Sequence, residues 1–196
     1  MMSGRDLVEL VSDIRACRLC EAHLAPRPIL RVSPTASLCL VGQAPGARVH
    51  KSGVPWTDPS GDRLRDWLGL ERDVFYDERH IAIVPMGFCF PGLDAKGGDR
   101  PPRRECAVHW RKALFEALPD FKLTILIGGY AQKWHLGKAN RENLTQTVKA
   151  WRNYAPRYVP LPHPSWRNNA WLKKNPWFDR DLLPYLRLRV RRLLSL

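Results

Sequence analysis

Four short apolar segments alternate with helical patterns along the chain. The apolar segments, at 37–42, 80–84, 123–128 and 157–161, resemble strands that are buried on both faces of a parallel sheet. Apolar residues recur at helical spacing around them, at 4–22, 62–70, 103–118, 130–136 and 181–196. This alternation predicts an α/β fold, with a parallel sheet covered by helices on both faces. The length of 196 residues predicts a single domain over residues 1–196.

Ligands of parallel α/β sheets bind beyond the carboxyl ends of the strands, among the loops that follow them. The loops after the first, second and fourth apolar segments, at 43–61, 85–102 and 161–171, are the parts of the chain richest in Gly, Pro, His and Trp. We therefore expect a functional site built from these three loops.

The first loop holds two motifs. Gly42-Gln43-Ala44-Pro45-Gly46 predicts a tight turn that lets the backbone approach a ligand, although any strand-to-helix turn can look like this. Ser52-Gly53-Val54-Pro55-Trp56 presents an aromatic side chain on a stiff segment, which suits stacking on a flat ring. The alternative is that Trp56 covers the core, as some of the 8 tryptophans must.

The last loop contains His163-Pro164-Ser165-Trp166-Arg167-Asn168. A histidine beside a proline-restrained turn can donate a hydrogen bond to an anionic leaving group. The Ser165 hydroxyl can bind a phosphate, and Trp166 or Arg167 can insert into a base stack. The alternative is an ordinary loop histidine whose hydrogen bonds are satisfied locally.

Charge narrows the class of partner. The chain has 32 Lys and Arg against 19 Asp and Glu, a formal net charge of +13. That excess favours a polyanionic partner, most often nucleic acid, over a merely basic surface. There is no stretch of about 18 consecutive apolar residues that could cross a membrane, and acids at Asp6 and Glu9 make Met1–Val11 unlike a signal peptide. We expect an intracellular, cytoplasmic protein.

Five cysteines in an intracellular chain argue against a disulfide framework. Cys17-x2-Cys20 together with Cys89 and Cys106 suits a site with four cysteine ligands, for zinc or for an iron–sulfur cluster. The alternative is four buried thiols without a ligand. Cys39 lies within the first apolar segment and is expected to fill the core.

These motifs occur in an order that resembles the uracil-DNA glycosylase superfamily. Paired cysteines, a strand, GQAPG, GVPW with the following SG, two further cysteines, ILIGGYA and a His-Pro motif resemble the iron–sulfur family 4 branch. SGVPW and HPSWRN look more like the single-strand-selective monofunctional enzymes. The resemblance implies a three-layer αβα sandwich with a four-stranded parallel sheet and a uracil pocket at the strand ends. It also implies a [4Fe-4S] cluster, with zinc as the alternative, on Cys17, Cys20, Cys89 and Cys106.

The resemblance implies a monofunctional, monomeric enzyme that flips uracil out of single- or double-stranded DNA and hydrolyses its N-glycosidic bond, leaving an abasic site. Trp56 would stack on the flipped uracil, and His163 would donate to uracil O2. Ser165 and the backbone of 163–168 would hold phosphates, while Trp166 or Arg167 would fill the vacated stack. The residues expected to approach the sugar and the attacking water are Gly42, Gln43, Ala44, Pro45 and Gly46.

Two departures from the family pattern affect the chemistry. Family 4 enzymes usually carry a Glu where this chain has Gln43, which can orient water but cannot act as a base. Asp58 is our candidate for a recruited carboxylate, the alternative being an aspartate that caps a turn.

The second departure is the uracil-reading Asn, whose place is taken by Pro85-Met86-Gly87. Uracil must then be read by backbone groups such as those of Gly87, or by Asn168 or Asn169. His50 and Lys51 are candidate DNA contacts, the alternative being a solvated loop. Two rival functions remain: a glycosylase of the same fold for hypoxanthine or xanthine, and a non-catalytic protein that binds DNA lesions.

Overall fold

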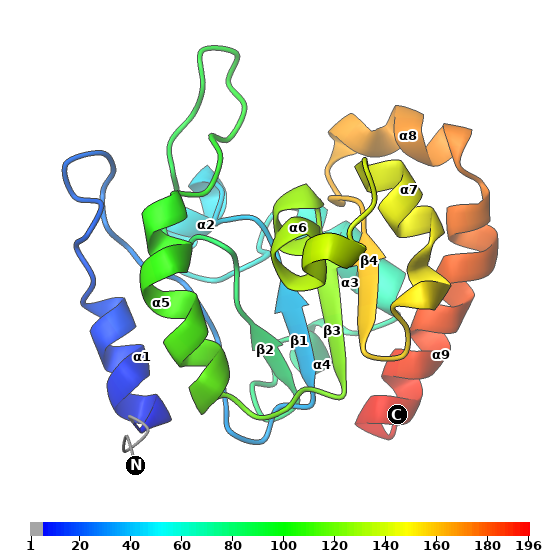
Figure 1. The fold of residues 1–196 in the computed structure, drawn as a ribbon, viewed down its shortest axis with the longest axis horizontal. Coiled ribbons are helices and arrows are strands. Elements are labelled where there is room, and N and C mark those ends of the chain that lie inside the picture. The colour runs from blue at the N-terminus through cyan, green and yellow to red at the C-terminus, as the bar shows by residue number, and fades with distance from the viewer. Residues whose placement is uncertain (1–5) are drawn as a thin grey trace.

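A computed structural model describes residues 6–196 and contains one four-stranded sheet, drawn in Figure 1. Its strands are β1 (Leu38–Val41), β2 (Ile81–Ile83), β3 (Leu123–Ile127) and β4 (Tyr158–Leu161). The order across the sheet is β2-β1-β3-β4, and all three pairings are parallel. The four strands coincide with the four apolar segments to within a residue or two at each end, so the predicted fold class is confirmed.

Helices cover both faces of the sheet. They are α1 (Leu7–Arg15), α2 (Ala47–Ser52), α3 (Pro59–Leu68), α4 (Arg72–Phe75), α5 (Arg104–Ala117), α6 (Gly129–Leu136), α7 (Leu144–Lys149), α8 (Asn169–Lys174) and α9 (Leu183–Leu194). One core layer joins α1, α5 and α6 to the sheet, and the other joins α3, α7 and α9 to the opposite face. Among residues 6–196, no helix is long and apolar enough to cross a membrane.

Strand alternation explains the two core layers. Leu38 and Leu40 of β1 belong to the layer of α3 and α9, whereas Cys39 and Val41 belong to the layer of α1 and α5. All four side chains are completely buried, because successive residues of a strand point to opposite faces of a covered sheet. Cys39 therefore fills the core, as predicted.

Three predicted segments differ from the structure, one of them being 161–171, predicted as a loop, which contains the start of α8. The helix expected over 4–22 ends at Arg15, since Ile14 is its last core-facing residue and the chain then passes into turns; residues 4 and 5 lie outside the described part. The segment 43–61, predicted as a loop, contains α2 and the start of α3. Helix α2 buries only Val49, so it leaves no apolar periodicity to detect.

Candidate active site

A pocket opens at the carboxyl edge of the sheet, where the loops after β1, β2 and β4 converge. Its empty space, with open solvent at the mouth included, is about 500 Å³. Its lining residues are Ile29, Gly42, Ala44, Pro45, Gly46, Val49, Pro55, Trp56, Asp58, Ile83, Pro85, Asp99 and His163. The structure thus brings together predicted residues from the first and last loops, and adds Asp99 from the second.

Trp56 is fixed in the pocket wall by its own backbone. Its φ of 57° places it in the left-handed region, which non-glycine residues rarely adopt. The Trp56 carbonyl accepts hydrogen bonds from Arg65 Nη1 and from the Tyr76 hydroxyl, each at 3.1 Å. The indole ring lies so close to Gly42 that a Cβ there would be 2.9 Å from a ring carbon. Strain held by several partners at one aromatic residue is typical of a binding site.

His163 has one ring nitrogen in use and the other available. Its Nδ1 accepts a hydrogen bond from the Ser165 backbone N–H at 3.2 Å, so the neutral ring carries its proton on Nε2. Burial lowers the pKa of His163, an effect that the nearby Asp58 carboxylate partly opposes, and the ring is therefore neutral at pH 7. The ring centroid lies 5.7 Å from that of Trp56. His163 can thus donate one hydrogen bond from Nε2 to a flat ligand beside Trp56.

Asp58 and Gln43, the predicted carboxylate and amide of the first loop, both make hydrogen bonds within the fold. Asp58 is the N-cap of α3, and its Oδ1 accepts from the Gly61 N–H at 3.0 Å. Asp58 also lines the pocket, and its role as a recruited carboxylate stays a prediction. The Gln43 side chain lies outside the pocket lining and donates from Nε2 to the Arg100 carbonyl at 3.4 Å.

Ser165 and Asn168 lie behind His163 and outside the pocket lining. The Ser165 hydroxyl accepts from the Arg167 N–H at 3.2 Å, and Asn168 Nδ2 donates to the His163 carbonyl at 2.7 Å. Arg63 Nη1 donates to the Ser165 carbonyl and so ties this loop to α3. These bonds hold His163 in place. The residue types alone could not distinguish this positioning role from the phosphate binding predicted for Ser165.

Of the predicted DNA-contacting residues, Lys51, Trp166 and Arg167 are exposed, whereas His50 is partly buried. Trp166 is 71% exposed, and the Arg167 guanidinium lies 5.6 Å from its ring centroid. His50 and Lys51 lie in the last turn of α2, with the His50 ring 5.9 Å from Phe90. Gly87 lies against the neighbouring cysteine pocket, and its N–H is already bonded to the Gln43 carbonyl.

The arginines of α9 lie away from this edge. In Figure 1, α9 runs from the loop side of the sheet towards the opposite end, where the chain terminates. Arg187 donates to the Asp66 carbonyl at 2.9 Å, and Arg191 donates to the Leu196 carbonyl at 2.9 Å. Part of the net positive charge thus stabilises α9 and its contact with α3.

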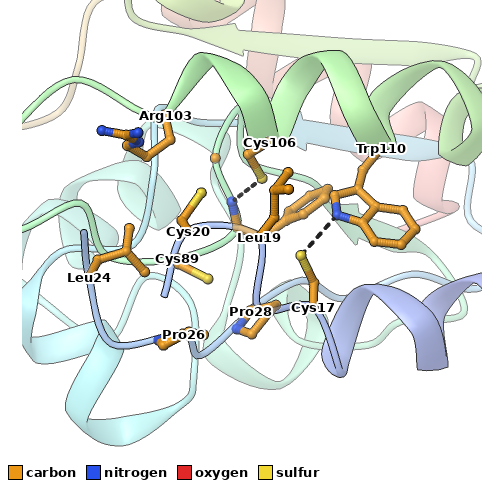
Figure 2. A pocket seen from close by; sticks show the side chains of 12 residues that line it. Cys17, Leu19, Cys20, Leu24, Pro26, Pro28, Cys89, Arg103, Cys106 and Trp110 are labelled. Carbon is orange, nitrogen blue, oxygen red and sulfur yellow. Dashed lines mark hydrogen bonds between the residues drawn. The ribbon is translucent and has the colours of Figure 1, made fainter. Parts of the chain in front are cut away.

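A second pocket gathers the four predicted cysteine ligands. Figure 2 shows Cys17 and Cys20 from the turns after α1, Cys89 from the loop after β2, and Cys106 from α5 around one apolar space. Trp110 Nε1 donates to Cys17 Sγ at 3.3 Å, and the Phe88 N–H donates to Cys106 Sγ at 3.4 Å. Fully buried Cys39 lies apart in β1.

Burial affects the protonation of two cysteines in this pocket. Burial raises the pKa of Cys106 to about 12 and also raises that of Cys89, so both are protonated thiols unless a cation binds. No three His, Cys, Asp or Glu side chains in residues 6–196 are grouped closely enough to hold a single metal ion. N–H donors to sulfur, as on Cys17 and Cys106, are a usual feature of iron–sulfur sites.

One short segment joins the two pockets. Pro85 lines the candidate active site, and Cys89, four residues later, lines the cysteine pocket. The Met86 N–H donates to the Gly42 carbonyl at 2.9 Å. Arg111 of α5, only 1% exposed, donates to the Pro85 carbonyl at 2.9 Å and so holds the start of this segment against the cysteine-bearing helix.

Comparison with known proteins identifies the family of the chain. A family model described as the uracil DNA glycosylase superfamily matches residues 31–187, which include every residue lining the candidate active site except Ile29. A crystal structure of wild-type SMUG2 from Pedobacter heparinus is matched at 13% sequence identity over 100% of this chain and 97% of that one. Its TM-score of 0.38 is too low for residue roles to be transferred. The length of the family match establishes that the chain belongs to the uracil DNA glycosylase superfamily.

Proposed function

We propose that the protein is a monofunctional glycosylase that removes uracil from DNA by hydrolysing its N-glycosidic bond. The observation that carries this proposal is the pairing of Trp56 and His163 in one pocket, with ring centroids 5.7 Å apart and the Nε2–H of His163 free to donate. An aromatic face and a single directed donor suit a planar base that leaves as an anion.

His163 would act on the leaving base. Breaking the N-glycosidic bond leaves the bonding electron pair on the base, and the negative charge spreads onto its carbonyl oxygens. A neutral imidazole that donates from Nε2 to such an oxygen strengthens its hydrogen bond as the charge develops. The Ser165 N–H on Nδ1 and the Asn168 amide on the backbone carbonyl keep this donor aimed.

Base reading would fall to the backbone of the first loop. Neither Asn168 nor Gly87 lines the pocket, and no other asparagine does. Within residues 6–196, the backbone N–H groups of Ala44 and Gly46 donate to no acceptor, and both residues are in the pocket wall. Uracil carries two carbonyl acceptors, which these donors suit.

DNA would be held around the pocket by exposed residues of the last loop. A base in a duplex can reach the pocket only after it leaves the stack, and a side chain that enters the vacated space stabilises that state. Trp166 is large, exposed and carried by the same short turn as His163. Arg167 beside it supplies positive charge for the flanking phosphates.

The test is base release from oligonucleotides that carry one uracil, hypoxanthine or xanthine, in single-stranded and duplex form. We expect uracil release and an abasic product, with the His163→Ala variant as the control for a contaminating enzyme. Release of hypoxanthine or xanthine with uracil left intact would reassign the substrate. Tight binding of uracil DNA without release of any base would identify a lesion-binding protein instead.

We further propose that Cys17, Cys20, Cys89 and Cys106 hold a [4Fe-4S] cluster, as in the iron–sulfur branch of the superfamily. Two features support this proposal: the four cysteines line one pocket, and N–H groups donate to the sulfurs of Cys17 and Cys106, as is usual at iron–sulfur sites. When bound, the cluster supplies cross-links between α5, the turns after α1 and the loop after β2.

Anaerobically purified protein should be brown and contain about four irons per chain. A Cys89→Ser variant should lose colour and iron, whereas Cys39→Ser, a control thiol outside the pocket, should keep both. Colourless protein with one zinc per chain would retain the four-cysteine site and reject the cluster.

A further inference from the structure

Asp99 lies on a hairpin that is closed by its own hydrogen bonds. The Asp94 N–H donates to the Gly98 carbonyl at 2.7 Å, and the Arg100 N–H donates to the Gly92 carbonyl at 2.9 Å. The Asp94 carboxylate also closes the turn, accepting the Gly98 N–H at 2.8 Å. This hairpin, which follows β2 and precedes α5 in the chain, projects above α5 at the top of Figure 1. Asp99 is therefore carried by a turn that is closed by its own hydrogen bonds.

The hairpin places the Asp99 carboxylate over the first loop of the pocket. Its Oδ2 lies 3.4 Å from the position that a Cβ on Gly46 would take. The Gln43 side chain, through its bond to the Arg100 carbonyl, ties the base of the hairpin to the same loop. The carboxylate thus lies beside Gly46, at an ordinary van der Waals distance from the place of its missing Cβ.

Asp99 differs from Asp58, the other carboxylate in the pocket lining, in what it is bonded to. Asp58 has one oxygen committed to the N-terminus of α3. Neither oxygen of Asp99 accepts a hydrogen bond or forms an ion pair within residues 6–196, and the residue remains solvent-exposed at the pocket rim. Asp99 is therefore free to accept protons from water.

The rim is also where the sugar of a flipped nucleotide must lie. The base enters the pocket, but the sugar stays attached to the DNA backbone outside it. Positive charge develops on the sugar during bond cleavage, whereas negative charge develops on the base. A carboxylate at the rim therefore stabilises the sugar cation without facing the leaving base.

We propose that Asp99 is the catalytic carboxylate that orients the attacking water and stabilises the cationic sugar, a role that rests on the proposed glycosylase function. The bond between sugar C1′ and the base nitrogen breaks, and its electron pair leaves with the base. The water oxygen forms the new bond to C1′, and Asp99 takes the proton that the water releases. The chain thus supplies from the second loop the carboxylate that the GQAPG motif lacks.

The charged groups around Asp99 come from three segments. Shielding from solvent raises its pKa; Arg167 of the last loop opposes this, and the carboxylates of Asp58 and Asp94 add to it. The ionised form of Asp99 is required for the reaction. We therefore expect the excision rate to fall as the solution is acidified, and to do so at a pH above the usual pKa of an aspartate.

The test is single-turnover release of uracil by the Asp99→Asn and Asp58→Asn variants. Asparagine keeps the helix cap at position 58, so both variants remove one charge at nearly constant shape. D99N should slow excision on the order of 10²–10⁴-fold, a typical loss for one acid–base group. D58N should lose less of its excision rate than D99N. The acidic limb of the pH–rate profile should persist in D58N and disappear in D99N. Asp120→Asn, at an exposed carboxylate paired with Arg157, controls for the change in net charge.

Two results would overturn the assignment. If wild-type and D99N proteins excise uracil at similar rates, Asp99 has no catalytic role, although the glycosylase function stands. If D99N keeps its rate but changes which base it releases, Asp99 reads the base instead. A wild-type protein that releases no base refutes the proposed function itself, and the role of Asp99 with it.

Discussion

Replacing Gly61 by alanine should displace Trp56. A Cβ on Gly61 would lie 1.9 Å from the Trp56 carbonyl oxygen, more than 1 Å inside the 3.0 Å limit that real Cβ atoms respect. The atom that it meets is backbone, and Arg65 and Tyr76 hold it from the other side. The first turn of α3 therefore has no room for a side chain at position 61 unless Trp56 moves.

The expected cost follows from these contacts. Overpacking costs about 1–3 kcal/mol, and each hydrogen bond lost from the Trp56 carbonyl adds about 1 kcal/mol. In urea denaturation, Gly61→Ala should lose about 2–4 kcal/mol of unfolding free energy. A typical domain has an unfolding free energy of about 5–15 kcal/mol, so the variant should stay folded. Excision by the folded variant should drop on the order of 10²-fold, because a 1 Å misplacement of a binding group costs about that much.

Gly129→Ala is the matched control. Gly129 is exposed in the first turn of α6, and a Cβ there would meet nothing within 4 Å. This variant should match the wild type or gain up to about 1 kcal/mol, since alanine restricts the unfolded chain. If Gly61→Ala unfolds with the wild-type midpoint and excises uracil at the wild-type rate, the reasoning about Trp56 is refuted.

Three further predictions concern histidines and the exposed tryptophan. His163→Ala should retain its circular dichroism spectrum and slow excision on the order of 10²–10³-fold, the usual loss of one donor to a developing anion; near-normal excision would contradict its role. Trp166→Ala should weaken binding to uracil-containing duplex by about 1–3 kcal/mol in a titration, as lost base stacking predicts, and unchanged affinity would exclude insertion. Burial beside Arg111 lowers the pKa of His135 from 6.5 to about 3. Below pH 6.5 the unfolded chain therefore binds a proton that the folded chain excludes, so His135 should reduce the unfolding free energy by about 2 kcal/mol by pH 5. In urea denaturation at pH 7 and pH 5, His135→Gln should lose less stability than the wild type; equal losses would contradict the shift.

The strands and the convergence of the loops were predictable because both follow from simple periodicities. Runs such as residues 123–128 are apolar throughout only when both faces of a strand are covered, and parallel strands bring their following loops to one edge. The meeting of Trp56 with His163 follows directly from that rule.

The division of labour within the loops was not predictable from residue types. Asp58 and Asp99 are both aspartates in Gly- and Pro-rich segments, and only the structure shows that one caps α3 while the other has free oxygens. The signal that could have found Asp99 is its place after β2, since the loops after β1, β2 and β4 all contribute to the pocket. Ser165 and Asn168 likewise needed coordinates, because their bonds to His163 are local and leave no periodic pattern.

The segment from Pro85 to Cys89 serves as a wall of two pockets at once. Gly42 and Gln43 bind its backbone on the side of the candidate active site, and Phe88 and Cys89 face the cysteines on the other. An inserted or deleted residue here would shift one wall against the other, and no loop remains between them to absorb the change. The spacing of Cys89 from β2 is therefore under the same length constraint as the pocket itself, and chain length in this stretch should vary less among relatives than residue identity does.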